Sequence, residues 1–132
     1  MQTRQVRSIR FLCTILFLVL CAPAVANNAP EIPVVDGRVG SCRADFTVKD
    51  GAGKPIYNAS INVLLKYGLF NLRKTELGVG TNSDGKARFT GLPDSPKKPL
   101  EFQITSGTVS KSVTDDPSTN CNAVYEVILS VN

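Results

Sequence analysis

The sequence predicts an all-β fold: a seven-stranded Greek-key β-sandwich that follows an N-terminal signal peptide. Three observations support this prediction. Apolar residues recur at every second position from residue 44 onward, turn-forming residues interrupt them at short intervals, and two cysteines lie near the two ends of this region. Side chains two positions apart point to the same face of a strand, so this period is typical of strands with one buried face.

Residues 1–26 are expected to form the signal peptide. A basic head precedes an uncharged run over residues 11–20, and Ala24 and Ala26 form the small-x-small pattern of a cleavage site before Asn27. The run is shorter than the roughly 20 residues that a membrane helix needs, so we expect no membrane span after cleavage. The alternative is a retained N-terminal anchor. With the leader removed, the protein is expected to be secreted or periplasmic.

Composition excludes several classes of function. The chain has 132 residues, a net charge of +4 and no histidine. Without histidine it has no Ser-His-Asp or Cys-His nucleophile system and no His-containing zinc site. Three of its 15 cations belong to the leader, so the remaining chain is nearly neutral. A nearly neutral domain lacks the basic surface that binds a phosphate backbone, so we expect no nucleic-acid partner.

The first half of the domain is expected to hold four strands. Residues 27–41 contain two prolines and little alternation, which predicts an extended lead-in before a sandwich at residues 42–132. Alternating runs then predict strands at 44–49, 59–66, 76–81 and 86–89. The dipeptide Asp84-Gly85 between the last two is a strong hairpin signal.

The second half is expected to add three strands. Three prolines within residues 92–99 exclude a strand interior there, because proline donates no ladder hydrogen bond. Alternation resumes afterwards and predicts strands at 100–104, 109–114 and 123–131. The strand at 109–114 carries Lys111 on its apolar face, which is typical of an edge strand protected by charge.

The cysteines are expected to form one disulfide. Cys13 and Cys21 leave with the leader, so only Cys42 and Cys121 remain in a compartment that favours oxidation. A redox couple or a metal pair would need a close spacing such as C-x-x-C, which these two lack. The bond would place the beginnings of the first and last strands side by side, so that the two strands run parallel.

The order of these signals resembles the carboxypeptidase regulatory-like domain. The most specific parts are Gly53-Lys54-Pro55-Ile56 followed by Asn58-Ala59, and the run over residues 81–93 that contains Asp84-Gly85, Phe89 and Gly91-Leu92-Pro93. The resemblance covers about residues 43–130. It implies a transthyretin-like (prealbumin-like) sandwich, related in architecture to the immunoglobulin fold.

The resemblance also implies a role without catalysis or a cofactor. Such modules are appended to other proteins, where they assist folding or present loops to a partner. The related hydroxyisourate hydrolases depend on histidines and on a C-terminal tetrapeptide, and this chain has no histidine and ends Leu129-Ser130-Val131-Asn132. We therefore expect no enzyme of that kind.

The loop over residues 67–74 is the candidate contact site. It places large apolar residues outside the alternation and next to cations; the residues are Leu69, Phe70, Leu72, Arg73 and Lys74. An exposed apolar loop between cations suits contact with a partner or a lipid surface. The sequence nevertheless favours the other interpretation, in which the three apolar side chains fold back and cap the open end of the sandwich.

Three other features do not indicate sites. The loop aspartates lack D-x-D-x-D spacing, so we expect turn-forming residues and no metal; they are Asp84, Asp94, Asp115 and Asp116. An isopeptide bond between Lys49 and Asn132, assisted by Glu101, is disfavoured because Lys49 lies opposite the apolar face. The sequon at Asn58 matters only if the protein is made in a eukaryote, and its place at the start of a strand favours a chance match.

The sequence thus predicts an exported, non-catalytic binding or structural module at or outside the cell surface. Its partner would be a protein or another cell-surface component, and nothing in the sequence determines the oligomeric state. One alternative is an accessory subunit of a surface assembly that pairs through an edge strand. Another is a small secreted hydrolase that uses carboxylates alone, but the glutamates are scattered over the lead-in and three strands.

Overall fold

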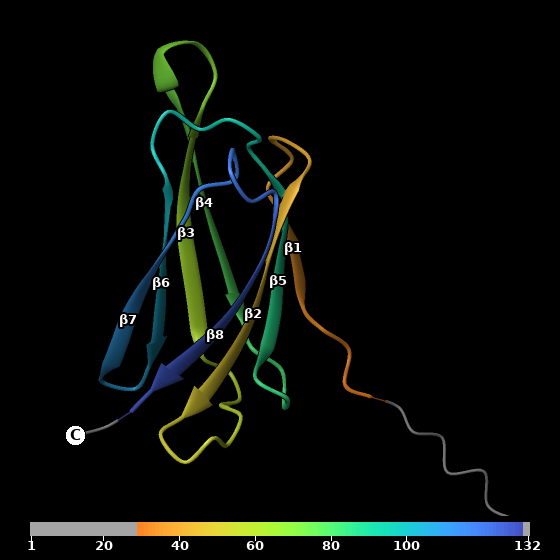
Figure 1. Ribbon diagram of the computed structural model, residues 1–132, viewed down its shortest axis with the longest axis vertical. Coiled ribbons are helices and arrows are strands. Elements are labelled where there is room, and N and C mark those ends of the chain that lie inside the picture. Colours follow the sequence, from red (N-terminus) through yellow and green to blue (C-terminus); the bar gives the residue numbers. More distant parts are fainter. Residues whose placement is uncertain (1–28, 131–132) are drawn as a thin grey trace, which may run out of the picture.

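Two four-stranded sheets pack face to face in the computed structural model, which describes residues 29–130 (Figure 1). The elements in chain order are β1 (Val34–Asp36), β2 (Cys42–Asp50), β3 (Ser60–Tyr67), the 3-10 helix η1 (Leu69–Asn71), β4 (Arg73–Gly80), β5 (Lys86–Leu92), β6 (Leu100–Ser106), β7 (Val109–Asp115) and β8 (Asn122–Leu129). One sheet has the order β1-β5-β2-β8 and the other β4-β3-β6-β7. The predicted β-sandwich is therefore confirmed.

The core lies between the sheets and follows the period of two. In β2 every second residue from Cys42 to Val48 is buried, and the residues between them are more exposed. Phe46 lies at the centre, with its ring centroid 5.8 Å from that of Phe89, 4.8 Å from that of Phe102 and 5.5 Å from that of Tyr125. Aromatic rings at these separations add to the stability that buried apolar area provides.

The strand number of seven was wrong, because the lead-in contributes an eighth strand. Val34–Asp36 forms β1, which pairs parallel with β5. The backbone N–H of Arg88 also donates to the Pro33 carbonyl at 2.9 Å, and the Asn82 side-chain amide donates to the Glu31 carbonyl at 3.0 Å. A strand of three residues is too short for a period of two to be recognised in the sequence. β1 is recognised only from its pairing with the edge of β5.

The topology of the terminal strands matches the expectation. β8 pairs parallel with β2 in a continuous register from Arg43 opposite Asn122 to Asp50 opposite Leu129. β7 is an edge strand, as predicted from Lys111. The hairpin predicted at Asp84-Gly85 was wrong, because β4 and β5 belong to different sheets and the turn there carries the chain from one sheet to the other. This turn forms around Asn82, whose side-chain oxygen accepts hydrogen bonds from the N–H groups of Asp84 and Lys86.

The expected signal peptide and the cleavage site predicted at Ala24 and Ala26 lie outside the described residues, as does Asn132. Within residues 29–130, no helix has the length and apolar character needed to cross a membrane.

Lys49 forms an ion pair with Glu126 on the outer face of its sheet, with 3.2 Å between nitrogen and oxygen.

Candidate functional site

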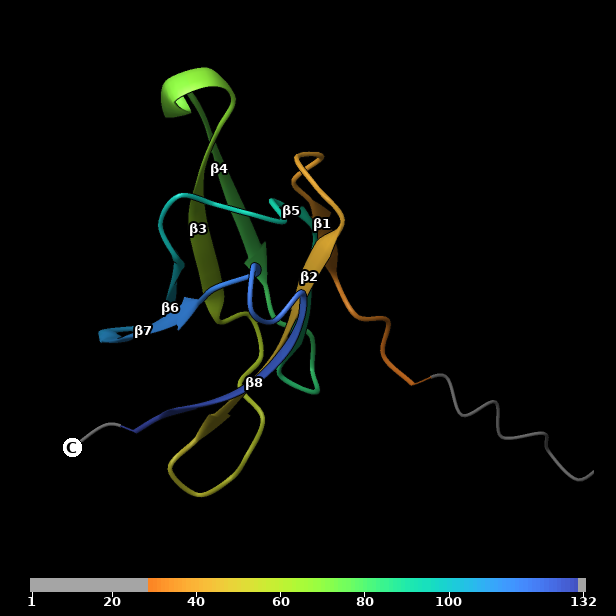
Figure 2. The same cartoon turned by 45° about the horizontal axis from the view of Figure 1, so that its top comes forward.

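The hairpin of β3 and β4 carries the candidate contact residues at its tip. We define the tip as residues 68–74. The backbone turns through Gly68, Phe70 and Asn71, which have φ values of 79°, 58° and 54°. Figure 2 shows this hairpin reaching beyond the other loops at its end of the molecule. The tip is therefore a projecting feature, and the last buried side chains of its strands are Leu65 and Leu77.

The apolar side chains of the tip are exposed. Leu69, Phe70 and Leu72 expose 78%, 74% and 78% of their surface. The favoured interpretation, in which they cap the sandwich, is therefore wrong. The physical reason is the length of the hairpin, because the pairing of Tyr67 with Arg73 continues the two strands past the end of the core. Arg73 and Lys74, expected in a loop, are the first residues of β4.

A groove of about 870 Å³ runs beside the tip along the outer face of the β4-β3-β6 sheet. Its floor includes Leu64, which is 47% exposed, and its rim includes Phe70 and Leu72. The groove also takes side chains from the loop between β5 and β6. Its charged lining residues are Lys66, Lys74, Glu76, Lys97, Lys98 and Glu101.

The lysines give the tip end of this groove a positive charge. Lys66 and Lys74 lie directly opposite each other in the β3–β4 register. The ammonium of Lys97 lies 6.0 Å from the centroid of the Phe70 ring, within reach of a cation–π contact. In the described part of the chain, the two ion pairs are Lys49–Glu126 and Arg88–Asp45, and both belong to the opposite sheet.

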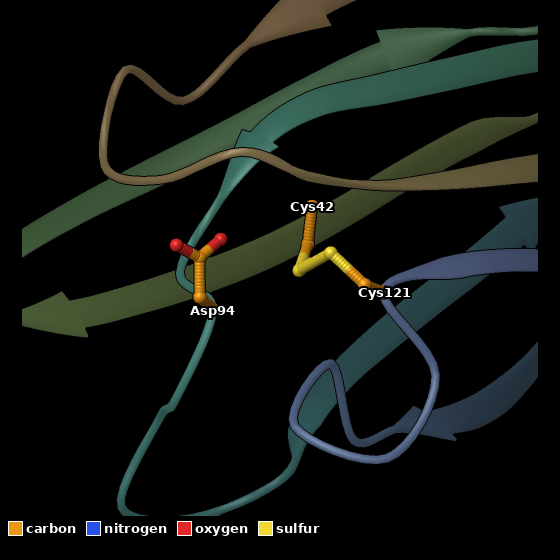
Figure 3. Close-up of side chains that lie close together, drawn as sticks. All are labelled: Cys42, Asp94 and Cys121. Atoms are coloured by element: carbon orange, nitrogen blue, oxygen red, sulfur yellow. A yellow bond between two sulfur atoms is a disulfide. The ribbon is translucent and has the colours of Figure 1, made fainter.

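The predicted disulfide between Cys42 and Cys121 is formed, with Cα atoms 4.6 Å apart (Figure 3). The carboxylate of Asp94 lies close by, and the three side chains place their sulfur and oxygen atoms within 4.8 Å of one another. Sulfurs bonded to each other offer no thiolate to a metal ion, so this cluster is a structural bridge. The Asp94 oxygen accepts hydrogen bonds from the Ser41 N–H and hydroxyl, both at 2.8 Å, and these lower its pKa.

Asp115 is a buried carboxyl that the sequence analysis placed in a loop. It is the last residue of β7 and only 2% exposed. Its Oδ1 accepts a hydrogen bond from the Tyr125 hydroxyl at 2.6 Å, and its Oδ2 has no partner among the described residues. Burial, and to a smaller extent the charge of Asp116, raises the pKa of Asp115; burial also raises the pKa of Tyr125. The alternation of β7 could have revealed this burial, because Asp115 lies two residues after Val113 and therefore on the same face of the strand.

No family model matches the chain, and no curated protein matches it. Among solved structures, it is similar to BcpA, the major pilin subunit of Bacillus cereus, with a TM-score of 0.51, 9% identity, and coverage of 70% of this chain and 31% of that one. It is also similar to catechol 1,2-dioxygenase from Pseudomonas arvilla C-1, with a TM-score of 0.50, 12% identity, and coverage of 77% and 59%. The chain therefore spans between about a third and three fifths of these proteins.

These likenesses show the fold, and they correct one expectation. The resemblance noted above implied that such a sandwich is a module without catalysis. The same β-sandwich is present in catechol 1,2-dioxygenase, which is an enzyme. The expectation that this protein is not an enzyme was therefore wrong as an inference from its fold.

Proposed function

We propose that the protein is an exported β-sandwich module, of the carboxypeptidase regulatory-like kind, that works by binding at the cell surface. The tip of the β3–β4 hairpin makes the contact. The observation that carries this proposal is the exposure of Leu69, Phe70 and Leu72 beside Arg73 and Lys74. Large apolar side chains that are gathered and exposed mark contact surfaces in soluble proteins, whereas single scattered ones do not.

Two further observations support export and a surface role. The Cys42–Cys121 disulfide suits an oxidising compartment, and the leader expected at residues 1–26 would deliver the chain to one. The fold is shared with a protein described as the major pilin subunit of Bacillus cereus.

Photo-crosslinking in the exporting cells tests the proposal. A photoreactive phenylalanine analogue is placed at Phe70 and, in a matched control, at Tyr57. Tyr57 is 73% exposed and lies in the segment between β2 and β3, at the opposite end of the sandwich (Figure 1). The proposal expects a discrete adduct, with protein or lipid, at position 70 and none at position 57. Equal labelling at the two positions, or none at either, would contradict it.

A second candidate function is a subunit of a surface assembly that pairs through β8. This strand is the edge of its sheet and has eight residues, among them Val124 and Ile128, which expose 76% and 39% of their surface. It contains neither lysine nor proline, the residues that usually protect an edge. The other edge of the sheet, β1, has only three residues.

Lysine substitution distinguishes this second candidate from the first. Val124→Lys on β8 should abolish self-association or the co-purification of a stoichiometric partner, because a charged edge resists strand addition. Val34→Lys on β1, where the valine is 54% exposed, is the matched control and should change nothing. A wild-type protein that stays monomeric and partner-free at every concentration would exclude assembly through β8.

A further inference from the structure

The shape of the tip indicates what kind of surface it contacts. Phe70 and Leu72 border the groove, but Leu69, which is equally exposed, does not line it. All three lie at the end of a hairpin that projects along the longest axis of the molecule (Figure 1). Apolar side chains on a convex end can be covered by a surface that yields around them. A peptide partner would instead use a concave strip lined by all three, and Leu69 lies outside the groove.

The backbone of the tip holds the phenyl ring outward at a cost. Phe70 has a φ of 58°, a left-handed conformation that a bulky residue seldom adopts. The ring is nevertheless 74% exposed, so burial among residues 29–130 offsets little of this strain. A strained backbone conformation that is not stabilised by packing of its side chain is typical of a binding site.

Cations are gathered just behind the apolar residues. Lys66 and Lys74 face each other across the hairpin, and like charges in directly opposite positions destabilise a sheet. Lys97 lies over the Phe70 ring, and Lys98 follows it in the same loop. The acid of β4 in this groove, Glu76, is opposite Leu64 and therefore one outward-facing position farther from the tip. Anions bound at this level would relieve the repulsion.

We propose that the tip docks on an anionic lipid bilayer. Leu69, Phe70 and Leu72 enter the boundary between headgroups and acyl chains, and the cations behind them bind lipid phosphates; these are Lys66, Arg73, Lys74, Lys97 and Lys98. Apolar insertion and a basic patch together give stable but reversible membrane attachment. Long basic side chains reach from a buried stem to the headgroup level. This inference rests on the proposed function and names the surface that the tip contacts.

Vesicle co-sedimentation of the mature, disulfide-bonded protein tests the inference. The protein should bind vesicles of phosphatidylglycerol mixed with phosphatidylcholine, and it should bind pure phosphatidylcholine about tenfold or more weakly. Binding should also fall when salt is raised from about 0.01 M to about 1 M, because the Debye length shrinks from about 30 Å to about 3 Å. Equal binding to both vesicles, or binding to neither, would overturn the inference.

Two pairs of variants separate insertion from charge. Phe70→Asp should weaken binding to anionic vesicles by about tenfold or more, whereas Tyr57→Asp should not, because Tyr57 is at the other end. The double variant Lys66→Gln/Lys74→Gln should weaken binding, whereas Lys54→Gln/Lys86→Gln should not. The tip has no buried side chain except the partly buried Asn71, and aspartate adopts a positive φ more readily than phenylalanine, so Phe70→Asp should melt at or slightly above the wild-type temperature. Full binding by a folded Phe70→Asp protein would overturn the inference.

The crosslinking experiment distinguishes the failure of this inference from the failure of the proposed function. A protein adduct at position 70 together with no vesicle binding would overturn lipid docking and leave a protein-binding tip. No adduct and no vesicle binding would overturn both.

Discussion

At the scale of single residues, two carboxyl groups acquire opposite properties from their surroundings. Asp94 is held as an anion by hydrogen bonds from Ser41, so its pKa is lowered. Asp115 is buried, so its pKa is raised, and the hydrogen bond from Tyr125 offsets only part of that effect. Asp94 therefore contributes stability that is lost as the pH falls, whereas Asp115 costs stability as the pH rises.

The variant Asp115→Asn should reveal this second dependence. Because the folded protein keeps the Asp115 proton to a higher pH than the unfolded chain does, the wild type loses stability as the pH rises from the ordinary aspartate pKa through the raised one. Asp115→Asn removes that loss, so its free energy of unfolding relative to wild type should increase over the same interval. Urea unfolding at several pH values measures it.

The variant Tyr125→Phe tests the direction of this pH dependence. The tyrosine hydroxyl lowers the pKa of Asp115, so its removal should extend the loss of stability to higher pH. It should also destabilise the protein by about 1–3 kcal/mol, because a buried oxygen loses its partner. Parallel pH curves for wild type and both variants would show that Asp115 does not titrate differently in the folded state.

At the scale of elements, the turn between β4 and β5 contains a glycine that both the local turn and the packing of a neighbouring strand require. From sequence alone, Asp84-Gly85 indicates a hairpin, but in the structure it forms a turn between the two sheets. In the structure, Gly85 has a φ of 72°, and a Cβ at this position would collide with the carbonyl oxygen of Val48 on the neighbouring β2. The glycine is needed both for the turn and for the close approach of another strand.

Gly85→Ala should therefore be much more harmful than Gly53→Ala. Gly53 has a φ of 82°, but a Cβ there would meet nothing within 4 Å. Its replacement should cost only the backbone preference, about 1–2 kcal/mol. Gly85→Ala adds a backbone collision and should lower the melting temperature further. Similar melting temperatures for the two variants would contradict the close approach.

The elements also show where a sequence pattern stops being informative. β2, β6 and β8 were predicted to within a few residues, because each buries alternate side chains along its whole length. β1 was missed because it is held by pairing with β5 and not by its own buried face. The first residues of β4 were taken for a loop because they pair with β3 beyond the core, where burial leaves no alternation.

At the scale of the whole molecule, the disulfide joins two strands that lie near opposite ends of the folded region in the sequence. Cys42 and Cys121 are 79 residues apart; Cys42 begins β2, Cys121 directly precedes β8, and these two strands lie parallel in one sheet. A crosslink over so long a loop restricts the unfolded chain strongly.

Replacement of both cysteines by alanine should lower the free energy of unfolding by roughly 4.5 kcal/mol on the chain-entropy estimate. The variant should still form a β-sandwich, because its two sheets bury a continuous apolar core. Urea unfolding of wild type and variant, followed by circular dichroism, measures the difference. A variant as stable as wild type would show that the bond adds nothing to the folded state.

The sandwich, the edge position of β7 and the pairing of the cysteines follow from the amino-acid sequence, because period-two burial, a charge on an apolar face and the last two thiols are local or countable features. The burial of Asp115, the formation of β1 and the exposure of the tip became visible only in the folded molecule. Each of these depends on where the core ends and which strand edge is free, and both are set by packing between segments far apart in the chain.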